Sequence, residues 1–184
     1  MKIPPIVVVL ALLSSTAVAA SEAPSPAVRI GAEEIQAAVK AGDSGPLADA
    51  VLRVLPVDAK YNVGVSVVRR SQVDGKAPPD AIVHDAVTEV YKIIEGRGVL
   101  VTGGTLEAPV PLPADGPIVR QITGPSSRGT GILGGERQSV GPGDIVVIPP
   151  NTPHGFVEIS TSRIVYSVIR IDGGKVLELK PPAQ

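Results

Sequence analysis

The sequence predicts a mainly β protein, a sandwich or barrel, preceded by a short helical arm. Gly and Pro contribute 20 and 19 of the 184 residues, which is high for a helical protein and typical of a turn-rich β protein. Short apolar or alternating segments, rich in Val and Ile, recur at close spacing after about residue 60. Apolar residues make up 43% of the chain, so one domain can bury a core without disulfide bonds.

The first 20 residues have the organisation of a signal peptide. Lys2 supplies a positive start, residues 6–13 form an apolar core, and residues 14–20 are small. The apolar run is much shorter than the roughly 20 residues that a membrane span needs, and residue 21 is Ser and not the Cys of a lipoprotein. We expect residues 1–20 to be removed after residue 19 or 20. The mature protein would be exported, periplasmic or secreted, and free of the membrane.

Residues 21–56 are expected to form a linker and a helical arm. A polar, Pro-rich start is followed by a helix over residues 31–40, with Glu33 and Glu34 in the first turn, where the helix dipole favours acids. A second helix is expected over residues 44–54, because its apolar residues recur at helical spacing: Leu47, Val51, Val54 and Leu55. Neither helix is long enough to be stable alone, so the arm should pack against the rest of the protein.

Residues 57–184 are expected to form the β-barrel domain. The strands predicted from alternation and from short apolar runs are residues 61–69, 81–84, 89–95, 99–102, 145–148, 156–159 and 164–171. The long segment 103–142 between them has few periodic features. Its Gly-rich part, residues 124–135, lacks the Gly-Lys-Ser/Thr ending of a phosphate-binding loop and the Gly-x-Ser-x-Gly of a hydrolase. It is therefore expected to be a surface excursion.

Composition excludes several classes of function. The net charge is -1 at pH 7 with no basic patch, and the four aromatic residues offer little surface for stacking bases, so nucleic-acid binding has no support. The chain has no cysteine, which removes thiolate nucleophiles, disulfides and zinc–thiolate sites. Histidine and carboxylate chemistry remains.

The only two histidines, His84 and His154, both lie in strand-and-turn segments. Glu89 follows His84 by five residues, so one continuous strand would place the two on opposite faces. They can converge only if residues 85–88 form a bulge or a turn. His154 follows a Pro-rich turn that would hold its imidazole rigidly. Together the three residues form a ligand set that suits Fe, Mn, Ni, Cu or Zn and leaves coordination positions open.

A plainer interpretation of the same residues stays open. Glu89 could pair with an arginine such as Arg69 or Arg170, and the two histidines could be unrelated. On this interpretation the chain would hold no metal.

The segment around Glu89 resembles the first motif of the cupin superfamily. That motif runs His-x-His, three or four residues, Glu, six residues and Gly. Glu89 and Gly96 have the required spacing, and His84 falls on the second histidine. Ile82 stands where the first histidine is expected.

Residues 143–158 resemble the second cupin motif, Gly, five residues, Pro-x-Gly, two residues, His, three residues and Asn. Gly143, Pro149 and His154 match. Asn151 replaces the inner Gly, a mild change because Asn also tolerates positive φ. Glu158 replaces the final Asn.

The resemblance implies a double-stranded β-helix, or jelly roll, with a metal inside one end. His84, Glu89 and His154 would bind a divalent transition metal, and the pocket would be lined by Ile82, Tyr91, Phe156 and Arg69, the last at its mouth. It also implies a homodimer and a small-molecule ligand. An oxygenase or isomerase and a non-catalytic binding barrel both remain candidates, and no catalytic residue is assigned.

Overall fold

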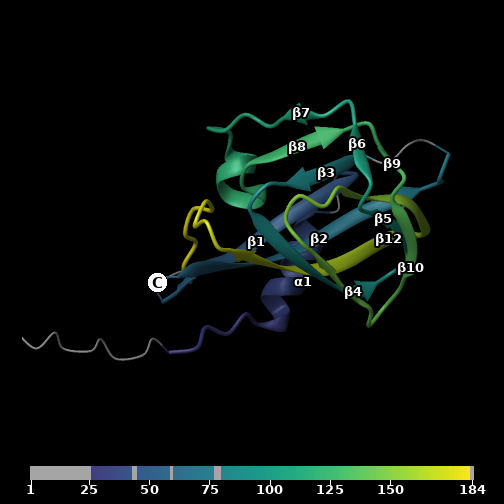
Figure 1. Ribbon diagram of the computed structural model, residues 1–184. Helices are drawn as coiled ribbons and strands as arrows, with labels where there is room; N and C mark the ends of the chain where they lie inside the picture. The colour runs from purple at the N-terminus through teal and green to yellow at the C-terminus, as the bar shows by residue number, and fades with distance from the viewer. Residues whose placement is uncertain (1–25, 43–44, 59, 77–79, 183–184) are drawn as a thin grey trace, which may run out of the picture.

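The structure is a computed structural model that describes residues 26–42, 45–58, 60–76 and 80–182. The expected signal peptide lies outside these residues. In the described part, an antiparallel sheet of ten strands and a second sheet of two strands make up the body of the protein. Figure 1 shows the main sheet strongly curved, with the short helix α1 beside it. The prediction of a mainly β jelly roll with a short helical arm is confirmed.

The helix α1 spans Ala32–Ala41, close to its predicted range, and carries Glu33 and Glu34 in its first turn. It packs on the outer face of the sheet. Its apolar side chains Ile35, Ala38 and Val39 contact a cluster of buried residues that belongs to three strands: Leu52, Val67 and Val165. The arm is therefore stabilised by tertiary packing, as its length requires.

The predicted second helix is wrong. Its residues form strand β1 (Leu47–Val57), which pairs antiparallel with β2 (Tyr61–Val73) from end to end. The apolar residues fit helical spacing, but β2 provides a hydrogen-bonding partner along the whole segment. Pro56 is tolerated because β1 lies at the edge of the sheet. The main sheet therefore includes residues from Leu47 onward, which were expected to lie in the helical arm.

The longest strand, β12 (His154–Asp172), organises the sheet. The segments 156–159 and 164–171, predicted as two strands, are its two halves. Along one side it pairs with β2, with a register shift between Ile159 and Arg163. Along the other, its first half pairs with β5 (Gly98–Thr102) and its second half with β4 (Val87–Glu95).

Two further strands lie where the sequence predicts strands: β3 (Ala81–His84) and β11 (Ile145–Ile148). Strand β10 (Glu136–Val140), which was not predicted, pairs antiparallel with β5. The segment expected to be irregular contains β6 (Thr105–Glu107), β7 (Val110–Pro111), the π-helical turn η2 (Val119–Thr123), β8 (Ser126–Gly129) and β9 (Gly131–Leu133).

The Gly-rich segment is not a surface excursion, which corrects the prediction. Strand β8 pairs antiparallel with β3 along its whole length, and Ser126 lies opposite His84. The segment therefore forms part of the sheet that carries the first histidine. None of the helices in the described ranges is both long and apolar enough to cross a membrane.

Candidate metal centre

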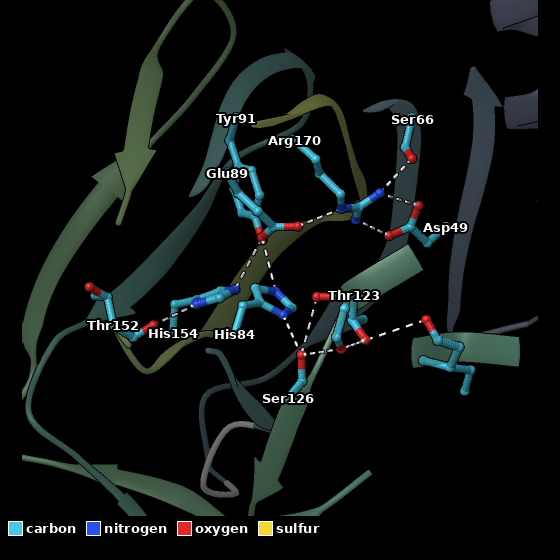
Figure 2. A network of polar contacts seen from close by, with 12 residues as sticks. Asp49, Ser66, His84, Glu89, Tyr91, Thr123, Ser126, Thr152, His154 and Arg170 are labelled. Carbon is cyan, nitrogen blue, oxygen red and sulfur yellow. Dashed lines mark hydrogen bonds and ion pairs between the residues drawn. The ribbon is translucent and has the colours of Figure 1, made fainter. Parts of the chain in front are cut away.

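His84, Glu89 and His154 converge at one end of the barrel (Figure 2). His84 ends β3, Glu89 lies on β4, and His154 begins β12. A bend at residues 85 and 86 separates β3 from β4, and this break brings Glu89 back toward His84. All three are buried, with exposed fractions of 4%, 1% and 3%. The Nε2 atom of each histidine lies 3.3 Å from Glu89 Oε2.

The ring of His154 is oriented by its own turn. Its Nδ1 lies 2.9 Å from the carbonyl oxygen of Thr152, which can only accept, so Nδ1 carries the proton. In the neutral ring the lone pair then sits on Nε2. This atom is buried and has no hydrogen-bond partner among the described residues, so its approach to Glu89 is a close contact and not an aligned hydrogen bond.

The ring of His84 is oriented by β8. Its Nδ1 lies 2.8 Å from Ser126 Oγ, and that hydroxyl donates to the carbonyl oxygen of Gly124 at 2.9 Å. Having given its one proton to Gly124, Ser126 accepts from His84 Nδ1–H, which again leaves the Nε2 lone pair facing Glu89. Burial lowers the pKa of His84 below its ordinary value, so the ring is neutral at pH 7.

Glu89 is held as a carboxylate. Arg170 Nε donates to Oε1 at 2.9 Å, and the hydroxyl of Tyr91 donates to Oε2 at 2.8 Å. Burial raises the pKa of Glu89, but the Arg170 guanidinium beside it outweighs burial, and this pKa is held well below its ordinary value. Burial, with Glu89 beside it, raises the pKa of Tyr91 well above its ordinary value, so Tyr91 remains a donor. The pairing of Glu89 with Arg170, left open by the sequence, is present.

Arg170 connects the triad to a second acid. Besides Glu89, its guanidinium donates to Asp49 Oδ2 at 2.5 Å and to Ser66 Oγ at 2.6 Å (Figure 2). Burial by itself lowers the pKa of Arg170, but Asp49 and Glu89 outweigh it and raise that pKa above its ordinary value. One buried cation is therefore shared by the buried carboxylate of Glu89 and the partly buried carboxylate of Asp49.

The residues present fit a metal ion. Two Nε2 lone pairs and one carboxylate oxygen point at one another, an arrangement that is repulsive unless a cation lies among them. Both Nδ1 atoms are hydrogen-bonded to oxygen, as the non-ligating nitrogen of a metal-bound histidine almost always is. The ligand atoms of the three side chains all lie within 4.8 Å of one another.

The triad opens into a cavity of about 260 Å³. Ile82 and Tyr91, expected to line a pocket, both line this cavity. Phe156 does not: it is packed in the core against Tyr166, with ring centroids 5.6 Å apart. Its place in the hydrophobic core explains the difference from the prediction.

Arg69 also lies elsewhere, and its neighbour Arg70 lines the cavity instead. Arg69 donates to the backbone oxygens of Gly42 and Gly45, beside the end of α1. In the structure Val67 packs under α1 and Val68 packs in the barrel core. Because side chains alternate along a strand, Arg70 and not Arg69 lies on the same face of β2 as Val68 and lines the cavity.

Several cavity residues were missed by sequence analysis. Asp49, Thr123 and Arg128 line the cavity, and Ser126 orients His84. Asp49 lies in the segment taken for a helix, Thr123 lies just before the segment taken for a surface excursion, and Ser126 and Arg128 lie within it. No motif marks them; only the pairing of β8 with β3 places Ser126 and Arg128 here.

The model of one protein family, described as the AraC-like ligand binding domain, matches residues 128–180 of the chain. No curated protein matches the chain. Among solved structures, the chain is similar to a protein of unknown function from Rhizobium leguminosarum, with 19% identity, 73% of this chain and 89% of that chain covered, and a TM-score of 0.40. It is also similar to a cupin protein from Bacteroides fragilis, with 17% identity, coverage of 68% and 74%, and a TM-score of 0.35.

A third similar structure is the EutQ protein of Clostridium difficile, with 10% identity, coverage of 70% and 69%, and a TM-score of 0.38. The chain's own features add to these likenesses. These are the jelly-roll sheet, the two motifs that meet at His84, Glu89 and His154, and the ligand-binding domain match over the second motif. In these features the chain resembles the cupin superfamily.

Proposed function

We propose that this protein is an exported metal-binding cupin that takes a small molecule into the cavity beside its metal. His84, Glu89 and His154 would hold a divalent transition metal, which could be Fe, Mn, Ni, Cu or Zn by the chemistry of the ligands. The observation that carries the proposal is the pair of buried Nε2 lone pairs that face one carboxylate oxygen at 3.3 Å.

Three protein ligands would leave coordination positions open toward the cavity. A bound metal would supply Lewis-acid or redox chemistry there, which supports an oxygenase or isomerase acting on a small molecule. The chain's own part is to orient both imidazoles through Thr152 and Ser126 and to keep Glu89 ionised through Arg170. Tyr91 remains a phenol and donates to the same carboxylate.

A second candidate function is a metal-free barrel that binds a small ligand without turnover. Two observations favour it. Arg170 and Tyr91 already occupy both oxygens of Glu89, and the positive charge of Arg170 opposes a metal cation nearby. Ile82 lines the cavity where the family motif has its first histidine, so a fourth protein ligand is missing.

Metal titration followed by calorimetry separates the two candidates. Mn²⁺, Ni²⁺, Zn²⁺ and, without oxygen, Fe²⁺ are titrated into the untagged protein between pH 5 and 8. Only neutral imidazole binds a metal, so the affinity should fall steeply below about pH 6, with up to two protons taken up per ion released.

The variants His154→Ala and Glu89→Gln should lose most of this affinity, and His154→Ala should also lessen the pH dependence. Glu136→Gln, which alters an exposed carboxylate on β10, is the matched control and should bind normally. Negligible metal binding at every pH would reject the metal proposal and favour the metal-free barrel. Oxygen uptake and isomer formation across a panel of small molecules then separate enzyme from binding module.

Export and dimerisation are part of the proposal and have separate tests. Export is supported by the charged start, apolar core and small-residue run of the first 20 residues. The intact mass of the exported protein should lack residues 1–19 or 1–20, and a mass that retains them would reject export. Sedimentation should show a homodimer, as the cupin resemblance implies; a monomer at all concentrations would reject this.

A further inference from the structure

We propose that the cavity beside the triad binds a small organic carboxylate through Arg70 and Arg128. The inference deepens the proposed function, because it names the class of molecule that would share the cavity with the metal. It rests on the charge balance of the cavity wall, the way Arg70 is held, and the apolar side chains around it.

The wall of the cavity carries an excess of positive charge. Three arginines line it, Arg70, Arg128 and Arg170, against two acids, Asp49 and Glu89. Among these five side chains the balance is one positive charge. Arg170 uses both acids, since it forms ion pairs with Asp49 and with Glu89. A metal in the triad would add further positive charge.

Arg70 and Arg128 are left without a carboxylate. Neither forms an ion pair with any residue in the described ranges. Asp80 is near enough to Arg70 to raise its pKa, but it is exposed and makes no ion pair with it. Guanidinium groups that line a cavity and have no protein counter-ion are suited to an anionic ligand.

Arg70 is held in place before any ligand arrives. Its Nε donates to the hydroxyl of Tyr166 at 3.1 Å, and its guanidinium carbon lies 5.9 Å from the centroid of the Phe156 ring. Tyr166 itself is buried in the core, next to Tyr91. One nitrogen and one face of the guanidinium are therefore occupied, while the two terminal nitrogens remain for the paired oxygens of a carboxylate.

The rest of the cavity favours a ligand with an apolar body. Its apolar lining comes from β1, β2, β3 and the η2 segment: Leu47, Val68, Ile82, Ile118 and Ile122. The volume of about 260 Å³ lies just below the range of roughly 300–1,000 Å³ of sites for drug-sized ligands. A single carboxylate on a small apolar group suits this combination better than a multiply charged phosphate.

Calorimetry with matched pairs of ligands tests the inference. Benzoate and benzamide, and butyrate and butyramide, are titrated into the full exported chain, with EDTA and then with Zn²⁺. Each pair has nearly the same shape and differs in charge. Each carboxylate should bind at least tenfold more tightly than its amide in the metal-free protein, so the result does not depend on the triad. Inorganic phosphate is titrated in parallel.

Arg128→Gln and Arg70→Gln should each weaken benzoate binding at least tenfold and leave benzamide binding unchanged. Arg137→Gln, an exposed arginine on β10, is the matched control and should behave like the wild type. If Arg70→Gln does not fold, Arg70→Lys takes its place. Lysine keeps the charge but loses the two-pronged contact, so benzoate binding should still fall.

Equal binding of carboxylates and amides, or a preference that survives both arginine substitutions, would overturn the inference. Phosphate binding more tightly than benzoate would overturn the carboxylate assignment. A charge preference that depends on both arginines, in a protein that binds no Zn²⁺, would reject the metal proposal and support the carboxylate site.

Discussion

The backbone N–H of Asn151 donates a hydrogen bond of 2.7 Å to the carbonyl oxygen of His84. This bond joins the turn of the second motif to β3, the strand with which the first motif begins. The same turn is held from another side, where Gly103 N–H donates to the carbonyl oxygen of Pro153 at 2.9 Å. Two segments about 70 residues apart in sequence are thereby fixed so that their histidines approach the same oxygen of Glu89.

The left-handed backbone of Asn151, with φ of 60°, leads to the first prediction. Asn tolerates this conformation and Ala does so less well, while the exposed side chain contributes little packing. Asn151→Ala should lower the free energy of unfolding by about 1 kcal/mol, measured by urea denaturation. Asn151→Gly is the control and should be close to the wild type. Equal stabilities for Ala and Asn would show that the turn does not require this conformation.

Ser126 is expected to support metal binding indirectly, by orienting the ring of His84. Ser126→Ala removes the oxygen that accepts from His84 Nδ1 and frees the ring to rotate or change tautomer. Loss of such a partner typically costs 10–100-fold in metal affinity, so the affinity for Zn²⁺ should fall by roughly that factor. Ser127→Ala, at the next position of β8, has no such bond and serves as the control. Identical affinities in the two variants would contradict the role of Ser126.

Ile82 tests whether the cavity can accept a fourth ligand. It lines the same cavity as His84 and lies opposite His154 between β3 and β12. Ile82→His should tighten metal binding by roughly tenfold or more, because it adds a neutral imidazole beside the triad. Ile82→Leu preserves the apolar wall and should leave the affinity unchanged. Calorimetry that finds no gain with histidine would mean that the side chain at this position cannot reach the metal.

Substitution of Arg170 is expected to lower the stability of the fold strongly, because two carboxylates depend on its buried charge. Arg170→Met leaves Asp49 and Glu89 without their shared cation, and breaking a buried pair in this way typically costs about 3–5 kcal/mol. Denaturant unfolding at pH 7 measures the loss. The control is Arg120→Met, which removes an exposed ion pair with Glu178 and should cost at most about 1 kcal/mol.

The pH dependence of the Arg170→Met variant follows from Glu89. In the wild type the pKa of Glu89 is depressed from its ordinary value of 4.5, so its contribution to stability is present above that pH and is lost as pH falls through the depressed pKa. Without Arg170, burial should dominate and raise this pKa, so stability should instead be lost as pH rises. The stability gap between the two proteins should therefore narrow from pH 7 toward pH 4. A constant gap would contradict this account.

Local sequence was enough to locate most of the strands and the two motifs. Strands β3 and β11 lie where their apolar runs begin and end, because a short run of Val and Ile between turn residues has few other stable conformations. The motif spacing singled out His84, Glu89 and His154, and the requirement that residues 85–88 interrupt the strand agrees with the bend at residues 85 and 86. The positive φ of Asn151 was also anticipated from its residue type.

Tertiary structure decided what local pattern left open. Leu47, Val51 and Val54 fit a helix as well as a strand, and only the presence of β2 as a partner selects β1. Val67 and Val68 are both apolar, so the inward face of β2, and with it the choice of Arg70 over Arg69 at the cavity, depends on α1 covering the other face. Glu89 could pair with either of two arginines by sequence, and the register of β12 against β4 places Arg170 opposite it.

The sequence by itself determined the composition of the site: two histidines, one glutamate and the motif spacing that selects them. It could not determine their surroundings, because Ser126 and Arg128 reach the site only through the non-local pairing of β8 with β3. Hydrogen bonds between strands depend on which segments meet in space. A Gly-rich segment has almost no hydrophobic periodicity from which its pairing partner could be predicted. The tautomers of the two histidines, the charge state of Glu89 and the lining of the cavity are set by those long-range contacts. They are therefore decided only in the folded chain.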